Sequence, residues 1–272
     1  MEKGAVIGKG REAEVIYWGN NRVLKLFYKE FPSNIVNYRF KVDILIEKIF
    51  TNCPKAFEVI KDNGRFGILY EYIEEVTLSE FLGRMKNTGV RKATRLLVEL
   101  QTEMHKYEIE DIKSQKNTLK WEIEQTNLLT NDQKNEIINY LEKLPDGNTI
   151  CHGDFHLGNI IASKKKLYVI DWANATSGNP YGDVARSFYL MKYGLGASDE
   201  KFIKKSFIHK FLLKIGKSFI SKIYIKHYLK LTGFSLKEVK KWDLVIFAAR
   251  LREGIPLENN NLLKMISKLL KH

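Results

Sequence analysis

The spacing of apolar residues changes near residue 75, and this change constrains the fold of the chain more than any other feature. Before that point apolar and polar residues alternate with period two, which predicts strands separated by turns. After it apolar residues recur at intervals of three and four, which predicts helices. A chain of 272 residues with this pattern is expected to form an α+β fold, with a small antiparallel sheet followed by a larger, mostly helical part.

The first part is expected to contain five strands and one helix. Glycine and asparagine tolerate a positive φ, so the segments Gly19-Asn20-Asn21 and Asp62-Asn63-Gly64 are predicted to be turns. The strands are expected at residues 5–8, 14–18, 22–27, 56–61 and 66–73, and the helix at residues 33–50.

The second part is expected to be helical with one interruption. Thr130 and Gln133 have the spacing of a capping box, which marks the start of a helix. A short strand-rich segment at residues 149–171 separates these helices from others that continue to the end of the chain. The helices before the interruption are expected at residues 79–85, 92–107, 114–128 and 131–144.

The composition is that of a globular cytoplasmic protein. Hydrophobic residues make up 44% of the chain and aromatic residues 12%, which excludes disorder and collagen-like repeats. The chain has no run of about 18 apolar residues and its first residues form no apolar signal region, so we expect neither a membrane span nor export. Cys53 and Cys151 match no disulfide framework or zinc motif and are expected to be buried thiols.

The positive charge lies at one end of the chain. The formal net charge is +13, but residues 1–200 contain 28 basic and 28 acidic side chains, whereas residues 201–272 contain 17 basic and 4 acidic ones. A basic C-terminal surface could contact nucleic acid or a membrane. The same counts arise when a lysine-rich chain places lysine on every solvated helix face, and we favour that explanation.

Titratable residues crowd into one short segment. Residues 150–161 read ICHGDFHLGNII, and residues 168–172 read YVIDW. A turn at residues 163–166 makes the segment a β-hairpin, so Asp154, Asn159 and Asp171 are expected to converge at one end of it. Two carboxylates and an amide suit Mg²⁺, and a carboxylate left off the metal can orient an attacking hydroxyl. This is the arrangement used for phosphoryl transfer; the alternative is that the three residues only cap turns.

These residues resemble a known family. HGDFHLGN followed by IDW is similar to the catalytic and metal motifs of the aminoglycoside phosphotransferase/choline kinase family, and residues 177–185, SGNPYGDVA, resemble its next motif. The resemblance implies a protein-kinase-like fold with two lobes. Residues 1–73 would form the N-terminal nucleotide-binding lobe, and residues 74–272 the C-terminal lobe for catalysis and acceptor binding.

The resemblance also implies an activity and its residues. We expect transfer of the γ-phosphate of ATP to a hydroxyl of a small molecule, with Asp154 as the catalytic base and with Mg²⁺ held by Asn159 and Asp171. His152 and His156 would brace the loop. Asp183 is expected to be a structural capping carboxylate, and His105 a hydrogen-bonded residue of the core.

The nucleotide side of the resemblance begins at residue 8. Residues 8–15 read GKGREAEV, one glycine short of the kinase phosphate loop, in which small residues such as Gly8 and Gly10 let backbone amides approach phosphate oxygens. Lys25 lies inside an apolar strand, where a charge is costly unless paired. Kinase-like folds use such a lysine on the α- and β-phosphates.

Residues 67–73 resemble the strand that leads to the hinge between the lobes. Backbone groups near Glu71, Tyr72 and Ile73 would then bond adenine, and Val15 and Ile170 would cover the two faces of the ring. Both residues are equally explained as ordinary core residues.

One departure from the family concerns the acid that pairs with the lysine. The stretch at residues 36–39 reads VNYR and contains no acid. The next acids are Asp43 and Glu47, and we carry Glu47 as a candidate partner of Lys25.

The acceptor cannot be named from the sequence. The four acids in residues 201–272 do not favour a polycationic aminoglycoside, and a neutral or anionic hydroxyl compound fits the basic helices better. The alternatives are a choline- or sugar-type kinase, and a kinase-like regulatory module that binds nucleotide without turnover. Choline would require an aromatic cage. The candidates for such a cage are Tyr224, Tyr228, Phe234 and Trp242. Aromatic residues at helical spacing more often belong to the core, and we favour that explanation for these four.

Overall fold

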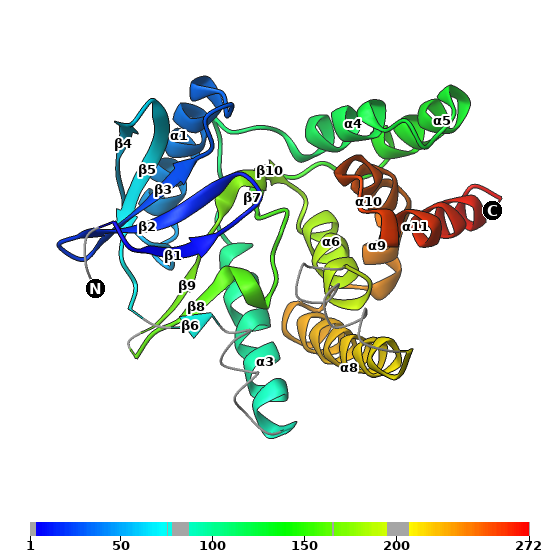
Figure 1. Cartoon of the computed structure of the whole chain (residues 1–272). Helices are drawn as coiled ribbons and strands as arrows, with labels where there is room; N and C mark the ends of the chain where they lie inside the picture. Colours follow the sequence, from blue (N-terminus) through cyan, green and yellow to red (C-terminus); the bar gives the residue numbers. More distant parts are fainter. Residues whose placement is uncertain (1–3, 75, 78–86, 165, 195–206, 272) are drawn as a thin grey trace. The chain divides into compact units, whose positions relative to one another are not determined.

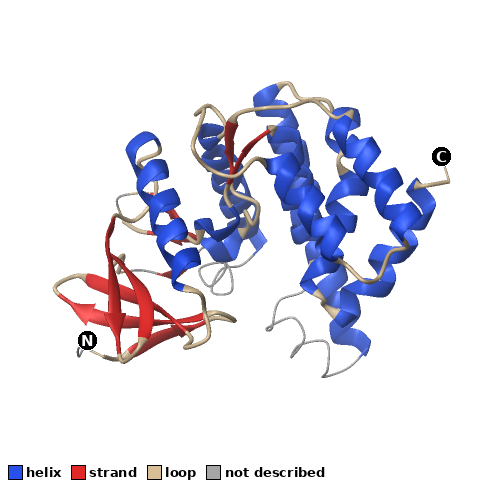
Figure 2. Ribbon diagram, turned by 90° about the horizontal axis from the view of Figure 1, so that it is seen from above, coloured by secondary structure: helices blue, strands red, loops and turns tan. Residues whose placement is uncertain are grey.

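The computed structural model describes residues 4–74, 76–77, 87–164, 166–194 and 207–271. The chain divides into two compact units. The first consists of Met1–Arg84 and Leu157–Ala173, and the second of Met85–His156 and Asn174–His272. The α+β class predicted from the sequence is confirmed, since the large antiparallel sheet lies in the first unit and most helices lie in the second (Figure 2). The domain boundary after residue 73 stays a prediction.

The first unit contains a five-stranded antiparallel sheet (Figure 1). All five predicted strands and both predicted turns are present, and Asn20, Asn21 and Asn63 have the positive φ angles that the turns require. The fifth strand ends at Glu71 rather than at residue 73. The strands are β1 (Val6–Lys9), β2 (Ala13–Gly19), β3 (Arg22–Phe27), β4 (Ala56–Asp62) and β5 (Arg65–Glu71), in the order β1-β2-β3-β5-β4.

One helix, α1 (Ser33–Ile49), covers one face of this sheet. The two faces have separate cores because side chains alternate along each strand. Leu24 and Leu26 of β3 pack with Leu69 on one face, and Phe27 packs with Ile68 and residues of α1 on the other. Lys25 therefore points toward the face that α1 covers.

A second, smaller sheet belongs to the same unit. Strand β8 (Ile160–Ala162) pairs with β9 (Leu167–Val169) as the predicted hairpin, and β6 (Val76–Thr77) pairs with the other side of β8. The 3₁₀ turns η1 (Leu157–Asn159) and η2 (Trp172–Asn174) precede and follow the hairpin. The amide of Val169 donates a hydrogen bond of 2.7 Å to the carbonyl of Asn52, which connects the hairpin to the loop after α1.

The second unit is mostly helical. Strands β7 (Thr149–Cys151) and β10 (Thr176–Gly178) form a small antiparallel pair within it. The predicted capping box is confirmed at Thr130 and Gln133. The helix predicted at residues 79–85 lies outside the described residues. The helices are α3 (Asn87–Met104), α4 (Gln115–Gln125), α5 (Asn131–Glu142), α6 (Pro180–Lys192), α8 (Phe207–Thr232), α9 (Leu236–Lys241), α10 (Asp243–Arg250) and α11 (Pro256–Leu269), with the turn η3 (Leu251–Glu253) between the last two.

Several single-residue expectations can be compared with the core. Cys53 and Cys151 are buried and unbridged, as predicted. Tyr224, Tyr228 and Trp242 are also buried, so they do not form the aromatic cage considered for choline. Among the described helices, none is long and apolar enough to span a bilayer.

Candidate active site

Lys25 meets a carboxylate in the first unit, but not the one expected on α1. Its Nζ lies 2.8 Å from Oδ1 of Asp171, a residue 146 positions later in the chain. The Lys25 side chain is 22% exposed and that of Asp171 is 45% exposed. A lysine that replaces an apolar residue in a strand requires such a partner. The structure thus brings together two residues that the sequence assigned to the phosphates and to the metal.

The backbone at Asp171 is unusual. Asp171 has φ +64°, in the left-handed region that few non-glycine residues adopt. Asp171 lies two residues after the end of β9, and its side chain contacts Lys25. Strained backbone of this kind is concentrated at functional sites, so the outlier favours a functional role for Asp171.

Asn159 lies beside the same turn. Its carbonyl accepts a 2.9 Å hydrogen bond from the amide of Ile170, the residue before Asp171. Carboxylate and amide oxygens are the ligand types that Mg²⁺ takes from proteins, together with water and phosphate oxygens. Across the described residues, no three His, Cys, Asp or Glu side chains cluster closely enough to hold a metal by themselves. The side-chain oxygens of Asn159 and Asp171 are of the types that would fit a cation whose shell is completed by water and phosphate.

The glycine-containing loop joins β1 and β2 tightly. The amide of Gly10 donates to the carbonyl of Ala13 at 2.8 Å, and the hydroxyl of Tyr28 donates to the carbonyl of Gly10 at 3.2 Å. A Cβ added at Gly8 would come no closer than 3.6 Å to Val15. The ligand-free fold therefore does not itself require glycine at position 8.

A salt bridge connects this loop to α1. Nη1 of Arg39 lies 2.7 Å from Oε2 of Glu12, and the guanidinium of Arg39 lies over the rings of Phe27 and Phe31. Arg39 occupies the stretch in which an acid was expected. Sequence reasoning missed this contact, because the charge of Arg39 alone does not identify Glu12 as its partner.

The two acids on α1 have other partners. Oε2 of Glu47 accepts a hydrogen bond of 3.1 Å from the amide of Ala56. Oδ2 of Asp43 accepts one of 2.5 Å from the hydroxyl of Tyr70. Burial raises the pKa of Asp43 to about 7, against the lowering effects of that hydrogen bond and of the charge of Lys25.

Val15 and the hinge residues all belong to the first unit. Val15 pairs directly with Lys25 across β2 and β3, so both side chains lie on one face of the sheet. The amide of Glu71 donates to Lys55 O at 2.9 Å, and that of Tyr72 donates to Asn21 O at 2.8 Å. These two amides already donate hydrogen bonds within the unit. Adenine binding at residues 71–73 stays a prediction, and it would require other backbone groups of that segment.

Asp154 belongs to the second unit, on the loop after β7. Its Oδ2 lies 3.5 Å from Nε2 of His156, and its amide donates to Nδ1 of His152 at 3.2 Å. Both histidines therefore contact Asp154, in keeping with the bracing role expected of them. Burial would raise the pKa of Asp154, but the hydrogen bond and charge of His156, with the charges of Arg186 and His152, hold it below its usual range. Asp154 is a carboxylate at neutral pH. Whether it converges with Asn159 and Asp171 stays a prediction.

Two residues of α6 form hydrogen bonds with the backbone of Gly153, the residue before Asp154. The amide of Gly153 donates to Oδ1 of Asp183 at 2.7 Å, and the carbonyl of Gly153 accepts from Nε of Arg186. Gly153 has φ +76°, and a Cβ there would come within 2.5 Å of the carbonyl oxygen of Asn174. The loop therefore requires glycine at this position. The spacing of Asp183 and Arg186, three residues apart on one helix, is the sequence signal that could have identified Arg186.

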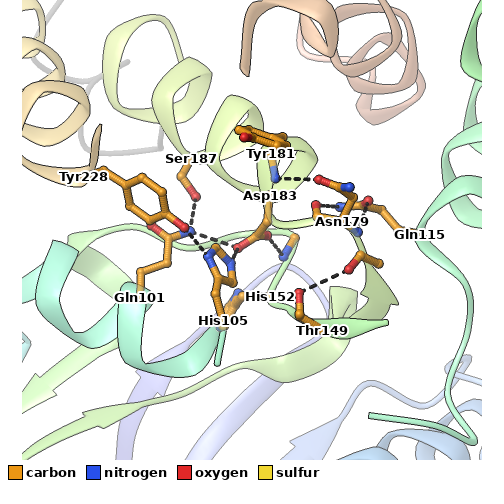
Figure 3. A network of polar contacts seen from close by, with 12 residues as sticks. Gln101, His105, Gln115, Thr149, His152, Asn179, Tyr181, Asp183, Ser187 and Tyr228 are labelled. Atoms are coloured by element: carbon orange, nitrogen blue, oxygen red, sulfur yellow. Dashed lines mark hydrogen bonds and ion pairs between the residues drawn. The ribbon is translucent and has the colours of Figure 1, made fainter. Parts of the chain in front are cut away.

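Asp183 lies at the centre of a buried polar network (Figure 3). Its Oδ2 accepts from Gln101 at 2.9 Å and lies 3.0 Å from Nε2 of His105, whose Nδ1 lies 2.6 Å from the hydroxyl of Tyr228. Burial would raise the pKa of Asp183, but the hydrogen bond and charge of His105 and the amide of Gly153 hold it below the usual range. The core role predicted for His105 agrees with these contacts.

The capping role predicted for Asp183 is wrong. The N-cap of α6 is Asn179, whose side chain accepts a hydrogen bond of 3.0 Å from the amide of Tyr181. Asp183 lies in the first turn of the helix and bonds the loop that carries Asp154. Its partners come from α3 and from that loop, and no local pattern near residue 183 reveals them.

A second network continues from Arg186. Its Nη2 lies 2.7 Å from Oε1 of Glu253, which also lies 2.6 Å from Nη1 of Arg250. Glu258 accepts two hydrogen bonds from Arg250, at 2.9 and 3.0 Å. The carboxylates near the C-terminal end of the chain thus contribute to holding Arg186 and, through it, Gly153.

Comparison with family models places the chain in a family. A model of the phosphotransferase enzyme family matches residues 14–204. The chain belongs to this family. A search of curated proteins found no match.

Solved structures similar to this phosphotransferase confirm the protein-kinase-like fold. Aminoglycoside phosphotransferase APH(4)-Ia is 12% identical, with a TM-score of 0.64 over 96% of this chain and 89% of that one. APH(2")-IIa, solved as a ternary complex with streptomycin and ATP, is 17% identical, with a TM-score of 0.56 over 98% and 90%. The amicoumacin kinase hAmiN, solved with AMP-PNP and Ca²⁺, is 13% identical, with a TM-score of 0.57 over 98% and 86%. The family resemblance noted in the sequence is confirmed.

Proposed function

We propose that this phosphotransferase transfers the γ-phosphate of ATP to a hydroxyl of a small molecule. The observation that carries the proposal is the 2.8 Å contact between Lys25 and Asp171. It places a strand lysine beside the carboxylate of the IDW motif within one unit, which supports a shared site for phosphates and metal. The bound nucleotides and small-molecule substrates of the structural neighbours support the same class of reaction.

In this proposal the first unit binds the nucleotide. Lys25 contacts the α- and β-phosphates, while Gly8 and Gly10 keep the loop narrow enough for its amides to approach phosphate oxygens. Asn159 and Asp171 would hold Mg²⁺, which would neutralise charge on the phosphates of the nucleotide. Lys25, which contacts Asp171 in the structure, would contact the phosphates when the nucleotide is bound.

Asp154 is proposed as the residue that acts on the acceptor. An ionised carboxylate accepts a hydrogen bond from the attacking hydroxyl and orients it. It receives the proton of that hydroxyl as the new P–O bond forms and the bond from the γ-phosphorus to the β,γ-bridging oxygen breaks, which releases ADP. His156 and Arg186 favour the ionised form of Asp154. Little proton transfer is needed early in such reactions, because the transition state is loose. A carboxylate with a low pKa is therefore suited to this role.

The acceptor is proposed to be a neutral or anionic hydroxyl compound. Three of the four acids in residues 201–272 already have basic partners: Glu238 contacts Lys241, and Glu253 and Glu258 contact Arg250. The fourth, Asp243, is half-buried. These carboxylates are engaged in the fold, which supports an acceptor other than a polycation.

The test is ADP release with a panel of hydroxylated metabolites, sugars and antibiotics, using the wild-type chain and Asp154→Asn. We expect one acceptor class to support turnover, and the variant to lose on the order of 10²–10⁴-fold in kcat. The variant should still bind Mg-AMP-PNP, because Asp154 is not assigned to the nucleotide. Wild-type turnover in the variant would remove the assignment of Asp154, and failure of the wild type to bind nucleotide would overturn the proposed function.

A further inference from the structure

Helix α8 is unusual in its charge. It spans 26 residues and contains six lysines but no aspartate or glutamate. One side of the helix packs against α3 and α6, and Ser221, Tyr224 and Tyr228 are fully buried there. These residues identify the inner side of α8.

The opposite side exposes large apolar residues and lysines. Leu212, Ile215 and Phe219 are 54%, 52% and 39% exposed. The guanidinium of Arg91 on α3 covers one part of the Phe219 ring, 5.5 Å from its centroid. Lys222, Lys226 and Lys230 are exposed further along the helix. At about 100° per residue, all six side chains fall within roughly 80° of arc, centred opposite the buried side. We call these six residues the outer face of α8; its first half is apolar and its second half is basic.

Among the described residues, no ion pair neutralises the lysines of the outer face. Glu253 and Glu258 bond arginines, Glu238 bonds Lys241, and Oε1 of Glu99 on α3 lies 3.6 Å from Nε2 of His227 on α8. Within the part of the chain that the structure describes, no carboxylate forms an ion pair with Lys222, Lys226 or Lys230. A complementary partner must therefore be anionic, and it must also accept three apolar side chains.

We propose that the outer face of α8 docks on the surface of a bilayer that contains anionic lipids. Apolar side chains of this size enter the boundary between headgroups and acyl chains, while lysines contact the lipid phosphates. Nucleic acid would account for the lysines but not for Leu212, Ile215 and Phe219, because contacts to the phosphate backbone are polar. The inference goes beyond the proposed function and does not depend on it.

The composition of α8 indicates that the helix would lie on the bilayer surface rather than span the bilayer. Six lysines in 26 residues are too many for a span, so the helix would lie in the plane of the interface. Each lysine near an anionic surface contributes about fivefold to partitioning, and this contribution falls as salt screens the charge. Binding is expected to be reversible and dependent on salt.

The experiment is co-sedimentation of the full chain with phosphatidylcholine vesicles, with and without phosphatidylglycerol, at low and moderate salt. We expect binding only to the anionic vesicles, with a decrease at moderate salt. The variant Lys222→Gln/Lys226→Gln/Lys230→Gln should lose about 100-fold in partitioning. Leu212→Ser/Ile215→Ser/Phe219→Ser should also bind more weakly, while keeping the dependence on salt.

The matched control is Lys264→Gln/Lys268→Gln/Lys271→Gln, on and just after α11, which removes the same charge from exposed lysines elsewhere in the unit. It should bind vesicles within about twofold of the wild type. An equal loss in both lysine variants would mean that net charge alone causes binding, which would overturn the proposal. Retention on heparin without binding to vesicles would assign the face to nucleic acid instead.

Discussion

Single residues in the left-handed region shape both parts of the candidate site. Asp171, at φ +64°, lies 2.8 Å from Lys25. Gly153, at φ +76°, places the loop of Asp154 against α6. The two positions differ in what they tolerate: an aspartate can adopt this conformation at some cost, whereas at Gly153 a neighbouring carbonyl also excludes any Cβ.

This difference predicts the effect of Gly153→Ala. The new Cβ would lie 2.5 Å from the carbonyl oxygen of Asn174, in addition to the cost of φ +76°. We expect the free energy of unfolding to fall by about 3 kcal/mol or more, measured by denaturant titration. Gly254→Ala is the control, because it also has a positive φ (+63°) but no heavy atom within 4 Å; it should cost only about 1 kcal/mol. Equal losses in the two variants would show that the contact with Asn174 does not matter.

Among the helices and strands, charged side chains on two helices bond loops that carry candidate site residues. Asp183 and Arg186, one turn apart on α6, bond the two sides of Gly153. Arg39 on α1 bonds Glu12 of the loop between β1 and β2. In both cases a helix in one part of the sequence orders a loop in another.

The contact between Arg39 and Glu12 can be tested by exchanging the charges. Arg39→Glu places two acids together and should weaken Mg-AMP-PNP binding by about fivefold, the worth of a good ion pair at a partly exposed site. Adding Glu12→Arg to this variant restores an opposite pair and should recover most of the affinity, measured by calorimetry. No recovery in the double variant would show that Arg39 acts through its contacts with Phe27 and Phe31 instead.

The start of α10 predicts a dependence of stability on pH. Burial raises the pKa of Asp243 to about 6, with Lys240 and Lys192 opposing the shift. A folded-state pKa above the unfolded value of 3.8 means that the folded chain binds the proton more tightly. The stability from this group is therefore present below about pH 4 and is lost as the pH rises through 6.

Asp243→Asn should remove this loss. The variant is expected to unfold at nearly the same temperature as the wild type at pH 4, and to be more stable by about 2 kcal/mol at pH 7.5. Thermal unfolding of both proteins across this range measures the difference. A stabilisation that is the same at every pH would contradict a buried, titrating carboxylate.

At the scale of the whole molecule, ligand binding is expected to stabilise the fold. Mg-AMP-PNP at about 100 times its Kd should add about 2.7 kcal/mol to the free energy of unfolding. Chelation of Mg²⁺ with EDTA should remove most of this gain, and Asp171→Ala should show little gain with or without EDTA. A thermal shift that survives both EDTA and Asp171→Ala would contradict the assignment of Asp171 to the metal.

The distribution of charge along the chain can be interpreted only with the tertiary structure. The sequence places the entire net charge of +13 in residues 201–272. The fold uses Glu238, Glu253 and Glu258 of this region in ion pairs, while Lys222, Lys226 and Lys230 remain exposed on one face of α8. Counting charges along the chain could not separate these two groups, because pairing depends on which helices pack together.

Local patterns in the sequence were sufficient to predict the strands of the large sheet and to identify the family. Alternation predicted all five strands of the large sheet, Asn-containing turns were located correctly, and HGDFHLGN with IDW identified the kinase-like fold. Such features depend on residues within a few positions of one another, where backbone sterics and side-chain periodicity decide the outcome.

Tertiary structure alone decided which side chains meet. Lys25 contacts Asp171 rather than Glu47, and Asp183 bonds Gly153 and His105 rather than capping its helix. These contacts join residues far apart in the chain, and the packing of whole elements, which no local pattern encodes, determines them.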